Sequence, residues 1–138
     1  MAVTANQVIK RQGGNWKRKN VPSAASKHHY EGCAVFLDAA GRGTDVKVDA
    51  NTVFAGIAIS EVDNSSGAAD ALNVEVWGDG DFQLPVTGAT LALQGTPVYA
   101  SDNFTFTMTA GTNPPIGTLT KFVSTGIGIV TIRGLGEK

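Results

Sequence analysis

From Gly32 onward, short runs of β-branched and aromatic residues are separated by Gly, Asp, Asn and Pro. Runs such as DVKVD, NVEVW and NFTFTMT alternate strictly, which is typical of strands with one buried and one solvated face. No window shows helical periodicity over about ten residues. The pattern predicts an all-β fold, a small antiparallel β-sandwich or barrel. The expected strands are 33–38, 44–49, 52–60, 72–77, 81–86, 90–93, 97–101, 103–109, 117–123 and 127–133.

Several expected strands supply the hydrophobic core, and the polar segments between them are expected to form turns. WGDGDF is interpreted as a tight turn, because Asp-Gly fits positions with positive φ. Phe104, Phe106 and Met108 alternate with threonines and form one apolar face, which is either core or a patch that packs subunits together. The other expected core residues of this region are Phe82, Leu84, Val86, Leu91, Leu93, Val98 and Tyr99.

The two halves of this β region resemble each other weakly. GCAVFLD at Gly32 and GTPVYASD at Gly95 share Gly-x-x-Val-aromatic, and Gly56 and Gly117 follow at similar distances. Each half closes on an alternating strand, LNVEVW or GIVTIRG. The similarity is either a real two-part architecture or a coincidence among β-rich segments.

The first thirty residues have a different composition. They hold six Lys or Arg residues and no Asp or Glu, whereas residues 31–138 hold five Lys or Arg against twelve Asp or Glu. They are polar and show almost no apolar periodicity, so residues 1–30 are predicted to be an extended basic arm that becomes ordered against a partner, and residues 31–138 the β domain. Trp16 lies between GGN and KRK, and tryptophan is a preferred anchor at interfaces.

Length and composition indicate a single domain without a disulfide framework. A chain of 138 residues can bury a sizeable core, and its one cysteine, Cys33, excludes an internal disulfide. Cys33 is expected to be a small core residue. No apolar run is long enough for a secretory signal or a membrane span, so we expect a soluble protein made in a reducing interior and no membrane partner.

The sequence offers few groups for chemistry. Its only histidines are the adjacent His28 and His29, and it contains no Gly-x-Ser-x-Gly elbow. These two histidines and Cys33 are fewer ligands than a structural zinc site requires. We therefore expect no catalytic residues, no cofactor and no metal.

Two alternatives rest on other residues. The basic arm is suited to contacting phosphates, but the acidic remainder of the chain would repel a nucleic acid. This makes a nucleic-acid-associated β-barrel a secondary hypothesis. A virion fibre or receptor-binding module that attaches to glycans is the other alternative, and Trp77 beside GDGD is its candidate aromatic residue.

Three segments resemble the capsid cement, or head decoration, proteins of tailed phages. They are VFAGIAISEV, DFQLPVTGATLALQGTPVYASDN and STGIGIVTIRG, and the similarity covers about residues 32–134. The family resemblance implies a structural virion protein without enzymatic activity, located on the outer surface of the capsid and made in the host cytoplasm. It also implies homo-oligomers, with the trimer as the expected form, that bind the major capsid protein at subunit junctions and stabilise the shell.

The basic arm is then predicted to attach the protein to the capsid or to a neighbouring subunit. Its cations would attract the partner and raise the association rate, and Trp16, seated in an apolar pocket, would provide most of the affinity. The predicted partner-binding residues are Lys10, Arg11, Trp16, Lys17, Arg18, Lys19 and Lys27.

Overall fold

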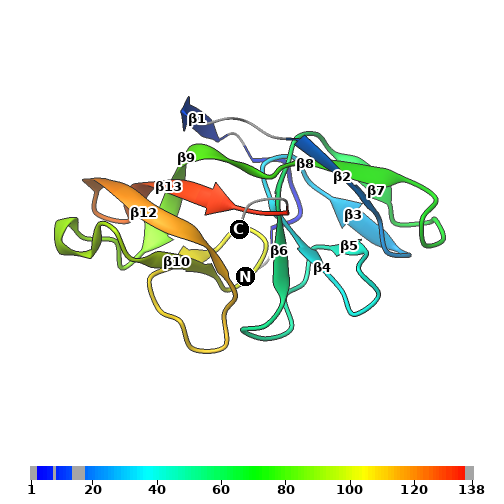
Figure 1. The fold of residues 1–138 in the computed structure, drawn as a ribbon. Helices are drawn as coiled ribbons and strands as arrows, with labels where there is room; N and C mark the ends of the chain where they lie inside the picture. The colour runs from blue at the N-terminus through cyan, green and yellow to red at the C-terminus, as the bar shows by residue number, and fades with distance from the viewer. Residues whose placement is uncertain (1–2, 8, 14–17, 136–138) are drawn as a thin grey trace.

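The fold is almost entirely β-structure, as the computed structural model in Figure 1 shows. Residues 3–7, 9–13 and 18–135 are described, with residues 10–13 described by their backbone alone. The all-β prediction is confirmed, and the arrangement is two barrels rather than a sandwich. The strands are β1 (Lys10–Gly13), β2 (Arg18–Pro22), β3 (Lys27–His29), β4 (Ala34–Leu37), β5 (Gly43–Thr44), β6 (Val53–Ala58), β7 (Val62–Asn64), β8 (Asn73–Trp77), β9 (Asp79–Thr87), β10 (Pro97–Ala100), β11 (Phe106–Thr107), β12 (Pro115–Ser124) and β13 (Ile127–Arg133), with a 3-10 helix, η1 (Leu91–Leu93).

The C-terminal barrel consists of β9, β11, β10, β12 and β13 in that order around its wall. Pairing of β13 with β9 closes it, from Ile127 opposite Pro85 to Arg133 opposite Asp79. All neighbours are antiparallel except β11 and β9, which run parallel at Phe106 and Val86. The first part of β9 extends beyond β11, and there β1 pairs with it on the side opposite β13.

The N-terminal barrel consists of β2, β8, β6, β4 and β5. A parallel bridge between Ser23 and Gly43 joins its first and last strands, and the Ala24 amide donates to the Gly43 carbonyl oxygen at 2.9 Å. The small antiparallel sheet of β3 and β7 accompanies this barrel. Figure 1 shows the two barrels side by side, with the blue-to-green strands on the right and the green-to-red strands on the left.

The two barrels have the same strand order, so the two-part architecture suggested by the sequence is real. β2, β4, β5, β6 and β8 correspond to β9, β10, β11, β12 and β13. The correspondence extends to single residues: Val35 opposes Gly56 and Val98 opposes Gly117, each next to a register shift. The parallel bridge of Ser23 with Gly43 likewise matches that of Val86 with Phe106.

The predicted boundary at residue 30 is wrong. β2 pairs along β8 from Arg18 opposite Trp77 to Pro22 opposite Asn73, and β3 pairs with β7, so residues 18–29 supply strands of the β domain. The backbone of β1 pairs antiparallel with β9. A separate arm was predicted because these strands bury few apolar side chains, and Val21 is the one that β2 buries.

The GDGD segment is not a tight turn. β8 ends at Trp77 and β9 begins at Asp79, so only Gly78 separates the two strands. Both β1 and β2 run antiparallel to this β8–β9 segment, which passes from one barrel into the other. β1 and β2 therefore pair with β9 and β8 as a ribbon that connects the barrels.

Each barrel has its own packed interior, and some positions that hold a large side chain in one barrel hold glycine in the other. Phe106 of the C-terminal barrel corresponds to Gly43, and Gly128 corresponds to Val74. A side-chain carbon on Gly43 would lie 3.2 Å from Val74, so a large residue at one position requires a small one at the other. The N-terminal interior comprises Val21, Val35, Ala55, Ala58, Val74 and Val76.

The outer wall of the N-terminal barrel packs toward the C-terminal barrel. Its Phe36, Ile57 and Trp77 are 0%, 0% and 8% exposed and belong to the same hydrophobic cluster as the C-terminal interior. Their counterparts Tyr99, Thr118 and Thr131 are partly exposed. The barrels thus contact each other through different faces, which explains why their outward residues have diverged.

Other predictions were wrong in detail. The expected strand 44–49 is reduced to β5, and the following residues Val46 and Val48 are 50% and 77% exposed. Residues 91–93 form η1, with Leu91 67% exposed, and only two residues of 103–109 form a strand. Of the core expected around Phe82, Phe82, Leu84, Val86 and Val98 are fully buried, whereas Leu93 and Tyr99 are only partly buried.

Candidate functional site

The seven predicted partner-binding residues do not form one described site. Arg18 and Lys19 are exposed on β2, and Lys10 and Arg11 belong to β1, whose backbone alone is described. Trp16 and Lys17 lie outside the described residues. The interfacial anchor predicted at Trp16 therefore stays a prediction.

Lys27 lies apart from the β2 cations. It begins β3, and its ammonium is 3.6 Å from a carboxylate oxygen of Asp45, which follows β5. This ion pair joins β3 to the segment that follows β5. The side chain is therefore engaged within the N-terminal barrel, a contact that could not be seen from sequence because Asp45 is distant along the chain.

Arg18 forms a cation–π contact at the end of β2. Its guanidinium carbon lies 4.9 Å from the centroid of the Trp77 ring, to which it is directly opposite in the strand pairing. Such contacts stabilise an arginine in a fixed position. Trp77 itself is 8% exposed, so its ring offers little of the open stacking surface that the glycan-binding hypothesis requires.

A hollow of about 320 Å³ lies beside this pair. Arg18 and Glu31 give it one cation and one carboxylate, and Ile59 and Trp77 give it apolar surface. The remaining lining residues are Gln7, Ile9, Gly32 and Ala58. The hollow is open and mixed in polarity, a composition suited to a polypeptide surface more than to a small apolar ligand.

The described residues of the N-terminal segment before β1 contact the chain's own barrels. The Gln7 amide donates to the Glu31 carbonyl oxygen at 2.6 Å, and Asn6 donates to Glu61 at 3.0 Å. The Val3 amide donates to the Asn103 side chain at 2.9 Å. Part of the predicted arm is therefore ordered by the protein itself.

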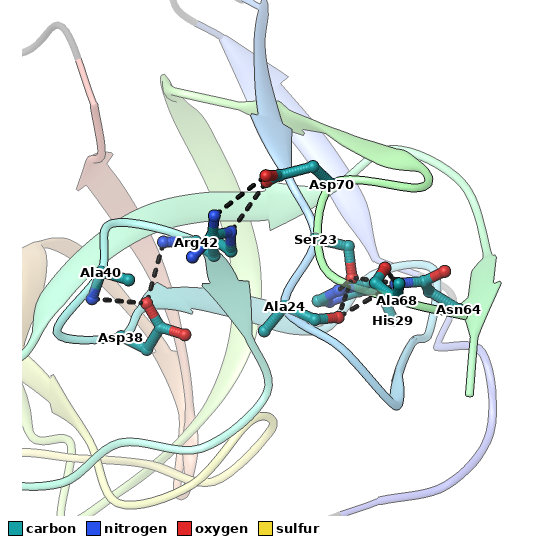
Figure 2. A network of polar contacts seen from close by, with 9 residues as sticks. All are labelled: Ser23, Ala24, His29, Asp38, Ala40, Arg42, Asn64, Ala68 and Asp70. Atoms are coloured by element: carbon teal, nitrogen blue, oxygen red, sulfur yellow. Dashed lines mark hydrogen bonds and ion pairs between the residues drawn. The ribbon is translucent and has the colours of Figure 1, made fainter. Parts of the chain in front are cut away.

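A buried polar network, shown in Figure 2, pairs His29 with a serine that the sequence motifs did not single out. Ser23 Oγ lies 2.9 Å from His29 Nε2, and the two residues are 0% and 2% exposed. The Ser23 hydroxyl also donates to the Ala24 carbonyl oxygen at 2.9 Å. Because a hydroxyl has a single hydrogen, His29 then donates from Nε2 to Ser23, the reverse of the transfer that would activate a serine nucleophile.

Asn64 completes this network from β7. Its side-chain amide donates to the carbonyl oxygens of Ala24 and Ala68 at 3.0 and 3.1 Å (Figure 2). Burial lowers the pKa of His29 below its usual value, while the nearby Asp45 carboxylate opposes this shift. The network connects the end of β2 with β3 and β7, which is a structural task, although His29 Nδ1 is buried without a hydrogen-bond partner.

Arg42 forms the second part of the network in Figure 2. Its guanidinium donates to both carboxylate oxygens of Asp70 at 2.8 and 2.9 Å, and its backbone amide donates to Asp38 at 2.9 Å. The Arg42 hydrogen bond holds the pKa of Asp70 below its usual range. The contacts join two loops of the N-terminal barrel.

Cys33 is buried, as expected, and burial raises the pKa of its thiol to about 12. Within residues 3–7, 9–13 and 18–135, no group of three or more His, Cys, Asp or Glu side chains is placed to hold a metal ion. Among the same residues, no helix is long and apolar enough to cross a membrane.

The repeat contains a signal that could have revealed β2. Pro22 corresponds to Pro85, and each follows a buried aliphatic residue, Val21 or Leu84. The sequences NVPS and QLPV therefore mark the same strand in the two barrels. Extending the internal comparison to the first thirty residues would have placed Arg18 and Lys19 on a strand.

Comparison with known proteins finds no matching family model, no similar curated protein and no matching solved structure.

Proposed function

We propose that the protein is a structural virion component that decorates a phage capsid by binding the major capsid protein at subunit junctions. The sequence resemblance to cement proteins suggests this function, and the internal repeat is the structural observation that supports it. Two barrels of one topology in a single chain provide two sets of loops at corresponding positions. A protein of this kind is suited to a lattice that repeats its own binding sites, because a second contact on the same lattice adds avidity.

The loops after β5 and β11 are candidates for those repeated surfaces. They occupy corresponding positions in the two barrels and lie near each other at the bottom of Figure 1. Lys47 donates to the Thr112 carbonyl oxygen at 3.1 Å and connects them. Val46 and Val48 project from the first loop with 50% and 77% exposure, which provides apolar contact area.

In this proposal the protein acts on the outer surface of the capsid, as a homo-oligomer and most favourably a trimer. A symmetric oligomer matches the symmetry of the sites where capsid subunits meet. No reaction is required for shell stabilisation, since a ligand that binds the assembled state alone stabilises it by mass action. Synthesis would take place in the host cytoplasm.

Co-sedimentation with emptied, nuclease-treated mature heads of the source virus tests this function. The expected result is saturable binding at fixed stoichiometry, weakened by Val48→Glu and unaffected by Leu91→Glu, a change at a similarly exposed residue of η1. Deletion of residues 1–30 is unsuitable, since it removes β2 and β3. Absence of binding to heads would contradict the proposal, and salt-sensitive binding to the released genome instead would favour the nucleic-acid alternative.

A further inference from the structure

The C-terminal barrel has an additional strand on its outside. The backbone of β1 pairs antiparallel with β9, with Lys10 opposite Gln83 and Gly13 opposite Asp81. β9 thus has β13 on one side and β1 on the other over the same residues. The side of β9 opposite β13, which we call its outer edge, therefore accepts a further strand.

The corresponding edge of the N-terminal barrel is that of β2. Arg18 corresponds to Asp81 and Asn20 to Gln83, because they occupy the same positions opposite β8 and β13. Arg18, Lys19 and Asn20 are all exposed. In the part of the chain that the structure describes, β8 is the only strand paired with these three residues.

The two edges differ in charge. The β9 edge has Asp81, which lies opposite Gly13 of β1, and the strand added to it has the sequence KRQG. The β2 edge has Arg18 and Lys19 instead. A second copy of the basic β1 would be repelled there, since like charges on adjacent strands are destabilising, whereas an acidic strand would be attracted.

We propose that the outer edge of β2 is an acceptor for an extended acidic segment of a partner protein, which adds antiparallel to Arg18–Asn20 as β1 does to β9. Main-chain hydrogen bonds would provide affinity and the two cations would select the partner. The contact of Arg18 with Trp77 holds this edge in place before binding, which reduces the ordering cost. The inference does not require the partner to be a capsid protein.

The test uses the full-length protein and a synthetic peptide of about eight residues, a typical strand length, with alternating glutamate and valine. The same peptide with lysine in place of glutamate is the control. Titration is followed by backbone amide chemical shifts in ¹⁵N-labelled protein. We expect saturable shifts centred on Arg18–Asn20 with the glutamate peptide, and binding at least about fivefold weaker with the lysine peptide.

Two variants test separately how charge and strand addition contribute to peptide binding. Lys19→Glu is expected to weaken the glutamate peptide at least about fivefold, whereas Lys121→Glu, a matched change at an exposed lysine of β12, leaves it unchanged. Asn20→Pro removes the backbone donor at the centre of β2 and is expected to abolish strand addition. If it impairs folding, Lys19→Glu carries the test. Absence of binding, equal binding of both peptides, or shifts centred on another strand would overturn the proposal.

Discussion

The carbonyl oxygen of Trp77 occupies the space that a side-chain carbon on Gly56 would need. The carbonyl oxygen of Thr131 stands in the same relation to Gly117. Both glycines lie beside the register shift of their barrel and face the last strand of that barrel. Both barrels therefore have glycine at this position because a neighbouring backbone carbonyl lies too close to allow a side chain.

Replacing either glycine should destabilise the protein strongly. Gly56→Ala and Gly117→Ala each force a backbone carbonyl to move, and we expect each to lower the free energy of unfolding by about 2–3 kcal/mol. Gly41→Ala is the control, because its φ of +83° is unfavourable for alanine but no atom lies within 4 Å of the added carbon. Its expected cost is about 1 kcal/mol. Urea denaturation measures all three, and equal losses would contradict the steric explanation.

The side chains of Leu119 and residue 128 compete for the same space, which should be visible as energetic coupling. Leu119→Ala leaves a cavity and Gly128→Val overpacks against Leu119, so each alone is destabilising. The double variant reproduces the Ala58 and Val74 pair of the other barrel. We expect it to recover about 1–2 kcal/mol relative to the sum of the single changes. Combining Leu119→Ala with Val21→Ala, in the other barrel, should be additive, and an additive Leu119–Gly128 cycle would refute this explanation.

Buried His29 should make the protein sensitive to mild acid. Its pKa is lowered in the folded state, so the unfolded chain takes up the proton first and stability falls as the pH drops below about 6.5, levelling off below the folded pKa. His29→Gln removes this titration and should flatten the stability profile between about pH 7 and pH 5. His28→Gln is the control.

Carboxylates contribute in a separate, more acidic range. The pKa values of Asp70 and Glu61 are lowered by hydrogen bonds from Arg42 and from Asn6, so their contributions are lost only as the pH falls below the usual carboxyl range. Thermal denaturation across pH distinguishes the two ranges. An unchanged slope near pH 6 in His29→Gln would show that another group titrates there.

Cys33 should be unreactive in the folded protein. Its thiol is 2% exposed and its pKa is raised from 9.0 to about 12, so the thiolate is about a thousandfold scarcer at pH 8 than in the unfolded chain. Labelling with a disulfide reagent at this pH should be slow and should accelerate in denaturant. Rapid stoichiometric labelling of the native protein would show that Cys33 is accessible.

The sequence predicted the strands whose alternation coincides with burial, such as Asn73–Trp77 and Ile127–Arg133. It failed where alternation exists without a covering layer, as at the exposed Val46 and Val48. It also failed at β2, whose single buried side chain, Val21, gives too weak a pattern. Periodicity reports how a segment would be buried, but whether it is buried depends on distant parts of the chain.

The candidate site was predictable in composition and not in arrangement. The cluster of cations was evident, and Arg18 and Lys19 are exposed on one strand. Lys27 lies on another strand beside Asp45, and Arg18 lies against Trp77, partners that only the fold brings near. The pairing of Ser23 with His29 was also missed, because the sequence pattern did not reveal the turn that places β3 after β2.

The ribbon formed by β1, β2, β8 and β9 has a consequence for how the protein is made. During synthesis, β2 leaves the ribosome early but has to wait for β8 before it is paired, so the N-terminal barrel cannot close until more than half of the chain has emerged. Such non-local pairing slows folding. Meanwhile the positive charge of residues 1–30 keeps the waiting segment hydrated and discourages its association with other nascent copies. The basic N-terminus that looks like an attachment arm would thus also protect the chain at its most vulnerable stage.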